Sequence, residues 1–217
     1  LVVWMRYLMQ TLGMTVIFTP KMGKAVIRTQ RPRLPLLRGL SLLSIGVLFI
    51  NGLRFIPLAE ATAVMFLAPL FVTLLSAWLL REKVSPSQWW VIGAGLLGVL
   101  LIVRPGGALF SPAILLPLGA SASFACYQLL TRYLGRTDHN VTSNFLSSLV
   151  GTIALAPFAL GNIDILWLMP TLELCMILVL GLIGMVAHML LTSALKYSSA
   201  ATLAPFTYAQ IIYAGII

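Results

Sequence analysis

Leu53-Arg54-Phe55 and Leu195-Lys196-Tyr197 are two short stretches of similar sequence that lie far apart in the chain. Each follows a long apolar segment and leads directly into another one. Five apolar segments lie between Arg54 and Lys196, and an odd number of membrane crossings places two equivalent sites on opposite faces of a bilayer. The pattern therefore predicts an inverted repeat, the architecture of many transporters.

The composition of the chain excludes a soluble domain. Hydrophobic residues make up 60% of the 217 residues and charged residues only 9%, whereas a soluble domain carries roughly 25% charged residues. Helices satisfy their own backbone groups in lipid, so the bilayer can cover an apolar outer surface. We therefore expect an all-α, polytopic membrane bundle with the lipid bilayer as its surroundings.

Short breaks that contain proline, glycine, serine or charged residues divide the sequence into eight apolar segments. Most of these segments exceed the roughly 17 residues that a helix needs to cross the hydrocarbon layer. The expected transmembrane segments are residues 1–19, 35–56, 58–80, 88–104, 112–134, 141–160, 170–194 and 199–217.

The basic residues give the chain a formal net charge of +9 and lie mostly in the short connections. A soluble nucleic-acid-binding module would interleave its basic residues with aromatic residues, and this chain does not. We therefore expect no nucleic-acid partner. Lysine and arginine are held on the cytoplasmic side of membrane proteins. We assign to that side Lys21, Lys24, Arg28, Arg31, Arg33, Arg38, Arg81, Lys83, Arg132, Arg136 and Lys196. Arg54 and Arg104 then lie outside, with Arg6 near the outer end of the first segment.

This orientation also predicts how the repeats are composed. It places residue 1 outside, and Ile217 falls within an apolar segment. One further helix at each end would complete ten helices in two groups of five. We therefore expect a first repeat over residues 1–106 that lacks its first helix, and a second over residues 107–217 that lacks its last.

Several motifs in these segments resemble those of a known family. In the first half they are Arg54-Phe55-Ile56-Pro57-Leu58-Ala59-Glu60-Ala61-Thr62-Ala63, Ala68-Pro69-Leu70-Phe71, Arg81-Glu82-Lys83-Val84, and a Gly93-x-Gly95-x-x-Gly98 helix that ends at Arg104-Pro105-Gly106. In the second half they are Ala194-Leu195-Lys196-Tyr197 and Leu203-Ala204-Pro205-Phe206-Thr207-Tyr208-Ala209-Gln210. The chain resembles the EamA domains of the drug/metabolite transporter superfamily, in a bacterial branch that includes carriers proposed for S-adenosylmethionine and riboflavin.

The resemblance implies a ten-helix fold, both termini in the cytoplasm, and a central cavity that opens alternately to each side. It implies a secondary transporter of the bacterial inner membrane that moves a small organic metabolite or drug, and we favour export over uptake. A homodimer is compatible with the sequence, and we expect no cofactor and no metal.

Ionisable residues inside the membrane are candidates for the solute cavity, because an unpaired charge in hydrocarbon is unfavourable by several kcal/mol. Glu60 could bind a cationic group or carry a proton, or it could simply favour the positive end of its helix dipole. Arg6 could attract an anionic solute, or it could reach toward lipid head groups. His188 could relay protons, or it could bond a neighbouring helix. Proton coupling is therefore a hypothesis that depends on Glu60 and His188.

Two proline-containing segments are further candidates. Tyr208 and Gln210 follow Pro205, whose ring removes a backbone donor and is expected to kink the helix. Pro69, followed by Thr73 and Ser76, gives the first half a similar arrangement. Either segment could hold the solute, or it could be a kinked helix that packs against its neighbours.

Four other residues complete the set of cavity candidates. Asn51, Tyr127 and Gln128 are polar groups near the middle of apolar segments, and such groups rarely face lipid. Phe66 is the fourth candidate. Cysteines introduced at Phe66 and Tyr208 should react with small aqueous reagents if these positions line a solvated cavity. By contrast, the glycines Gly93, Gly95 and Gly98 are assigned to helix packing, Trp89 and Trp90 to an interfacial belt, and Arg81-Glu82-Lys83 to a solvated loop.

Two other classes of protein are alternatives to a transporter. A membrane-embedded enzyme acting on lipid or isoprenoid substrates would need clustered Asp, Glu or His side chains near one interface, and the five acidic residues are scattered. A structural or sensory membrane protein would keep the repeat but would have no solvated cavity. We therefore favour a transporter over an enzyme.

Overall fold

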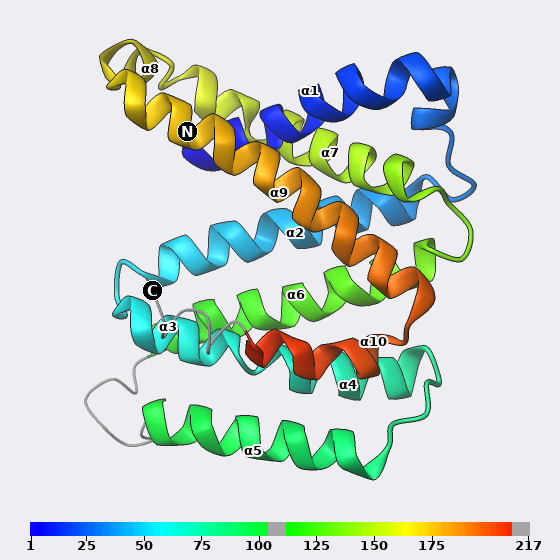
Figure 1. Ribbon diagram of the computed structural model, residues 1–217. Helices are drawn as coiled ribbons and strands as arrows, with labels where there is room; N and C mark the ends of the chain where they lie inside the picture. The colour runs from blue at the N-terminus through cyan, green and yellow to red at the C-terminus, as the bar shows by residue number, and fades with distance from the viewer. Residues whose placement is uncertain (104–111, 210–217) are drawn as a thin grey trace. The chain divides into compact units, whose positions relative to one another are not determined.

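The computed structural model describes residues 1–103 and 112–209, and all regular structure in these residues is helical. The predicted all-α class is therefore confirmed. The helices in chain order are α1 (Val2–Met22), η1 (Gly23–Ile27), α2 (Arg33–Gly52), α3 (Leu58–Met65), α4 (Ala68–Leu79), α5 (Pro86–Val103), η2 (Pro112–Ile114), α6 (Leu115–Leu134), α7 (Asn140–Leu160), α8 (Asp164–Leu168), α9 (Thr171–Tyr197), α10 (Ala200–Leu203) and η3 (Ala204–Tyr208), where η marks a 3-10 helix (Figure 1).

Among the described residues, five helical segments are long and apolar enough to cross a membrane. They are Arg33–Gly52, Leu58–Leu79, Pro112–Leu134, Asn140–Leu160 and Thr171–Tyr197. The expected segments 1–19 and 88–104 correspond to α1 and α5, which are helical but are not among these five. The last expected segment, 199–217, is described only as far as residue 209, and Arg104 lies outside the described residues.

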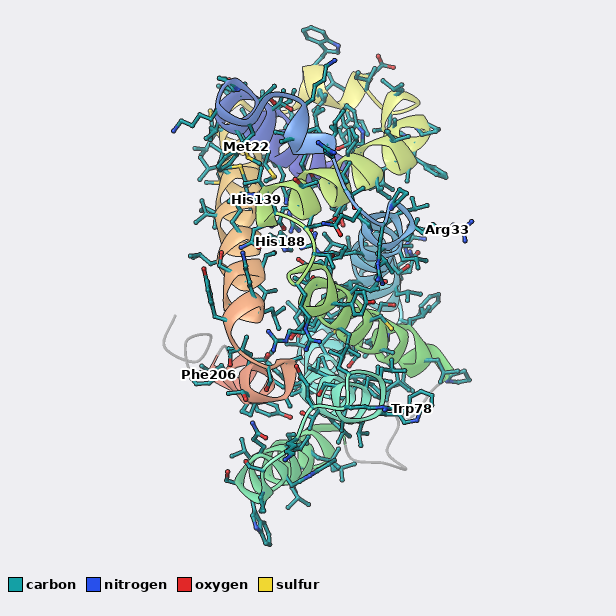
Figure 2. The ribbon with its side chains drawn as sticks, turned by 90° about the vertical axis from the view of Figure 1, so that its right-hand side faces the viewer. Met22, Arg33, Trp78, His139, His188 and Phe206 are labelled. Atoms are coloured by element: carbon teal, nitrogen blue, oxygen red, sulfur yellow. The ribbon has the colours of Figure 1, made fainter. Side chains whose placement is uncertain are left out.

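Large apolar side chains are exposed on most of the long helices. Trp78 on α4 is 76% exposed and projects outward from the ribbon (Figure 2), and Trp90 on α5 is 80% exposed. Water does not solvate such a surface, whereas lipid covers it. The chain is an integral, multi-pass membrane protein.

The chain folds as two compact units that each combine separate stretches of sequence. Unit 1 comprises residues 1–40 and 134–196. Within it, α1 packs along α7, and residues of η1 and α9 join them in an apolar core of Met14, Val26, Val141, Phe145 and Met185. Gly151 on α7 allows the ring of Tyr7 on α1 to approach, since a Cβ at Gly151 would lie 2.7 Å from that ring.

Unit 2 comprises residues 41–133 and 197–217. Here α4 packs against α10 and η3, and α3 packs against α5. Ala63 and Val64 on α3 form a small core with Leu67, Ile114 and Leu118. The boundary between the units falls within α2, between residues 40 and 41, and each unit uses chain from both predicted repeats.

The segment expected as one helix over residues 58–80 is interrupted. Helix α3 ends at Met65 and α4 begins at Ala68, so Phe66 and Leu67 lie in the break. Pro69 lies in the first turn of α4. Backbone N–H groups in a first turn have no partner within the helix, so proline removes no helical hydrogen bond there. The counterpart segment is also irregular, because α10 gives way at Ala204 to the 3-10 helix η3 with Pro205 in its first turn.

Candidate functional site

Within unit 2, α4 and the α10–η3 segment lie antiparallel. At one end, Glu82, which follows α4, contacts Ala200 at the start of α10. At the other end, Phe66, which precedes α4, contacts Tyr208 at the end of η3. The two irregular segments that follow the repeated Leu-Arg-Phe and Leu-Lys-Tyr stretches therefore run side by side in opposite directions (Figure 1).

The aromatic end of this pair consists of Phe66 and Tyr208. Their ring centroids lie 6.2 Å apart with a tilt of 40°, which is within the range of a favourable aromatic contact. The Tyr208 ring also lies against Gly95 on α5, where an added Cβ would overlap its Cζ atom. The absence of a side chain at Gly95 thus lets Tyr208 occupy this position beside Phe66.

Thr73 lies on α4 between the two ends and is fully buried. Its carbonyl oxygen accepts a hydrogen bond from Ser76 Oγ at 3.0 Å, but its own Oγ1 has no hydrogen-bond partner among the described residues. Buried hydroxyl groups are nearly always hydrogen-bonded. The Thr73 hydroxyl is therefore a group that a bound molecule could satisfy.

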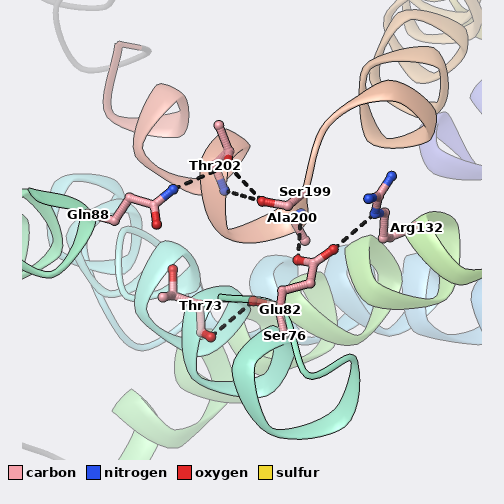
Figure 3. Close-up of polar contacts among 8 residues, drawn as sticks. All are labelled: Thr73, Ser76, Glu82, Gln88, Arg132, Ser199, Ala200 and Thr202. Carbon is pink, nitrogen blue, oxygen red and sulfur yellow. Dashed lines mark hydrogen bonds and ion pairs between the residues drawn. The ribbon is translucent and has the colours of Figure 1, made fainter. Parts of the chain in front are cut away.

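The polar end of the pair is organised by Glu82. Its Oε1 accepts a hydrogen bond from Arg132 Nε on α6 at 3.0 Å, as an ion pair, and its Oε2 accepts one from the Ala200 backbone N–H at 3.0 Å (Figure 3). The Glu82 side chain is only 8% exposed. Nearby, Gln88 Nε2 on α5 donates to Thr202 Oγ1 on α10 at 3.2 Å. The hydrogen bonds from Ala200 to Glu82 and from Gln88 to Thr202 tie the start of α10 to the rest of unit 2.

The prediction of a solvated loop at Arg81-Glu82-Lys83 is wrong for its central residue. Arg81 and Lys83 are exposed, but Glu82 is almost completely enclosed by its partners. Those partners lie 50 and 118 residues further along the chain. No local sequence signal identifies them, so the motif alone did not distinguish Glu82 from its neighbours.

The other predicted cavity residues of unit 2 lie on three helices. Glu60 is in the first turn of α3, as expected, and its buried Oε2 has no hydrogen-bond partner among the described residues. Asn51 on α2 is satisfied by its own helix, because its Nδ2 donates to the Val47 carbonyl at 2.7 Å. Tyr127 and Gln128 are buried on α6.

The remaining predicted residues are Arg6, His188 and Gln210. Arg6 is exposed on α1, and His188 is half-buried on α9, so both belong to unit 1. The His188 carbonyl accepts a hydrogen bond from Thr192 Oγ1 at 2.7 Å. Gln210 lies outside the described residues. The described candidates are therefore divided, two in unit 1 and the others in unit 2.

Sequence reasoning missed the environment of Arg38. It was grouped with the basic residues of the first connection, but it lies within α2 and is 1% exposed, whereas Arg33 extends away from the same helix (Figure 2). Four neutral oxygens accept hydrogen bonds from its guanidinium group: Ser143 O, Ser147 Oγ, Asn144 Oδ1 and Thr192 Oγ1. The signal that could have revealed them is the polar face of α7, which carries Asn140, Ser143, Asn144, Ser147 and Ser148 at helical spacing.

Comparison with known proteins identifies the family. The profile of the EamA-like transporter family matches residues 1–104 and 111–217. The chain belongs to the EamA-like transporter family. Within the described residues, no group of three or more His, Cys, Asp or Glu side chains is placed to hold a metal ion.

Several proteins named as transporters or exporters are similar to this chain. An S-adenosylmethionine uptake transporter of Rickettsia bellii is 29% identical over 195 residues, covering 89% of this chain and 66% of the relative. A riboflavin transporter of Rhizobium johnstonii is 30% identical over 197 residues, covering 87% and 62%. A pseudopaline exporter of Pseudomonas aeruginosa is 26% identical over 194 residues, covering 88% and 66%. The chain thus spans slightly less than two thirds of the length of these relatives.

A solved crystal structure is also similar to this EamA-like chain. It aligns with a TM-score of 0.73 at 20% sequence identity, over all of this chain and 79% of the other. At this identity the likeness concerns the fold alone.

Proposed function

We propose that the protein containing this chain is a secondary transporter that moves a small organic solute across the bacterial inner membrane by alternating access. The observation that carries the proposal is the antiparallel contact between two irregular segments, the α3–α4 break and η3, through Phe66 and Tyr208. Interrupted helices from the two halves of a repeat commonly form the solute site of such transporters. The antiparallel direction supports the assignment of residues 1–106 and 107–217 as inverted repeats.

The solute class is inferred from side chains of α3, α4 and η3 and of the α3–α4 break, together with the family. Two aromatic rings favour a solute with a planar ring system, and the Thr73 hydroxyl offers a hydrogen bond to a polar substituent. Glu60 adds a carboxylate oxygen without a described partner, which suits a cationic group. Relatives named for S-adenosylmethionine, riboflavin and pseudopaline support a small organic solute.

Direction and coupling are further parts of the proposal. We favour export, and the relatives include both uptake transporters and an exporter, so flux in both directions must be measured. We propose the proton as the coupling ion through Glu60 and His188, and we allow for a homodimer. If an imposed pH gradient leaves the flux of the reconstituted protein unchanged, proton coupling is wrong, while the transport itself stands.

Transport assays in proteoliposomes test the proposed site. S-adenosylmethionine and riboflavin are supplied to the purified protein that contains this chain, and saturable flux of at least one planar solute is expected. Phe66→Ala and Tyr208→Ala should each raise the half-saturating concentration about tenfold or more, since stacking on an aromatic side chain is worth roughly 1–3 kcal/mol. Trp78→Ala, on the exposed face of α4, is the matched control and should behave as the unaltered protein does.

Two results would contradict this function. One is the absence of saturable flux for every solute tested in both directions. The other is an equal effect of Phe66→Ala and Trp78→Ala, because the exposed tryptophan is not part of the site. A membrane-embedded enzyme draws no support from the relatives described above, which are named as transporters or exporters.

A further inference from the structure

Glu82 joins three parts of unit 2 that are separate in the sequence. Its carboxylate lies after the end of α4, pairs with Arg132 near the end of α6, and accepts the Ala200 N–H at the start of α10 (Figure 3). Both contacts are 3.0 Å long and the side chain is 8% exposed. Charge-assisted hydrogen bonds of this kind are roughly twice as strong as neutral ones.

Helix α10 depends on partners at its first turn because it has only four residues. Ser199 accepts the Thr202 N–H at 3.0 Å, which satisfies one of the amide groups that have no partner within the helix. The Ala200 N–H is satisfied by Glu82, which is not part of α10 or of its flanking residues. The start of α10 is therefore fixed in place by the connection that follows α4.

The two ends of the α10–η3 segment are attached by different kinds of contact. At the start, the attachments are polar: Glu82 to Ala200, and Gln88 to Thr202. At the end, Tyr208 packs against Phe66 and Gly95. Water can replace the hydrogen bonds at the start of α10, and the apolar residues buried there, Ala200 and Ala201, are small, so this end can be released without exposing aromatic surface. Thr73, fully buried on α4, lies between these attachments.

We propose that Glu82 is a positioning residue of the transport cycle, whose carboxylate holds the start of α10 against α4 and whose release opens the path to Thr73. The inference depends on the proposed transport function and names a residue that controls access to its site. The basic residues at or beside these contacts, Arg81, Lys83 and Arg132, indicate that the controlled side is the cytoplasmic one. Glu82 itself does not touch the solute; it acts through α10.

The first test measures access to Thr73 directly. In a protein whose Cys126, Cys175 and any cysteines outside this chain are replaced by serine, Thr73→Cys provides the one thiol, and a membrane-impermeant methanethiosulfonate is added to inside-out vesicles. Glu82→Gln preserves the shape of the side chain but leaves one accepting oxygen for two donors. It should raise the labelling rate at least about tenfold, the change expected in a two-state equilibrium when a hydrogen bond to a charged group is lost.

The matched control is Lys83→Gln, which removes a charge from the same connection at an exposed position. It should leave the labelling rate unchanged. Equal labelling in Glu82→Gln and the unaltered protein, or an equal rise in Lys83→Gln, overturns the proposal. Size-exclusion elution and the thermal unfolding midpoint are measured for each variant. These measurements distinguish a folded protein with a released α10 from a misfolded protein. The proposal requires a folded variant with a higher labelling rate.

The second test fixes the contact instead of removing it. Glu82→Cys combined with Ala200→Cys is bridged by a short bis-methanethiosulfonate reagent and then reduced. Cross-linking should abolish solute flux and reduction should restore it, while the single Glu82→Cys variant should not lose flux on treatment. Undiminished flux in the cross-linked protein overturns the role of Glu82. If the unaltered protein transports no solute, the proposed function fails, and the labelling test still decides whether Glu82 closes the path to Thr73.

Discussion

Arg38 and Asn144 are joined by a hydrogen bond of 2.9 Å from Nη2 to Oδ1, although 106 residues separate them. Asn144 in turn donates from Nδ2 to Thr192 Oγ1 at 2.9 Å, so one amide links α2 and α9 to α7 within unit 1. Arg38 is thus enclosed by hydrogen-bond acceptors from two other helices. A buried guanidinium group is stable only when its donors are satisfied in this way.

Replacing Arg38 should therefore destabilise unit 1. Arg38→Gln removes the guanidinium hydrogen bonds to Ser143, Ser147, Asn144 and Thr192, and we expect a loss of about 2–4 kcal/mol in the free energy of unfolding. Arg38→Lys should recover only part of this loss, because an ammonium group cannot reproduce the planar fork of donors. Thermal unfolding in detergent measures both. Arg33→Gln, exposed on the same helix, should unfold at the original temperature.

A second prediction concerns the space that Gly95 leaves for Tyr208. Gly95→Ala introduces a Cβ that overlaps the tyrosine ring, so the ring must move away from its position beside Phe66. We expect a several-fold weaker apparent affinity for solute and a stability loss of about 1–3 kcal/mol. Flux and unfolding measurements on the same preparation test this.

The control and the rescue for this prediction lie in the same region. Gly93→Ala, on the same helix, meets no atom within 4 Å and should have no effect on affinity. Combining Gly95→Ala with Tyr208→Ala removes the clash, so the stability losses of the two changes should not add. Additive losses would mean that the two residues do not interact.

The sequence predicts the helices of this fold well, for a physical reason. A membrane-spanning helix needs an unbroken run of apolar residues, so segments such as 112–134 and 141–160 can be delimited from hydropathy alone. The sequence indicates one segment over residues 58–80, with a kink at Pro69 as one alternative, and it does not predict the break at Phe66 and Leu67. Proline is tolerated in the first turn of a helix, so Pro69 marks the start of the second helix and not the break itself.

Polar contacts between distant segments were far less predictable. Arg38 and Glu82 look like members of basic or mixed loops in the sequence, and their enclosure results from partners contributed by other helices. The same limit applies to the two units, since each combines chain from both predicted repeats. Hydropathy identifies which segments are helical, but it contains no information about which helices pack together.

A third prediction tests the packing of α1 against α7 in unit 1. A Cβ at Gly151 would lie within 2.8 Å of three ring atoms of Tyr7, and Tyr7 is buried. Gly151→Ala should therefore lower the free energy of unfolding by about 1–3 kcal/mol. Gly184→Ala on α9 meets no atom within 4 Å and should not destabilise the protein. Similar unfolding midpoints for both variants would show that α1 and α7 are not closely packed there.

The last prediction concerns the lipid-facing surface. Trp78 is 76% exposed on α4, whereas the indole N–H of Trp4 on α1 donates to the Thr152 carbonyl at 3.0 Å and its side chain is half-buried. Each is studied as the single tryptophan of a variant in which the other four of the chain's five tryptophans, and any outside this chain, are replaced by phenylalanine. Lipids brominated on their acyl chains should quench the fluorescence of Trp78 strongly and that of Trp4 much less, since quenching requires contact with the bromine atoms. Quenching of Trp78 by iodide in the aqueous phase, with little effect of the brominated lipids, would contradict a lipid-facing outer surface of α4.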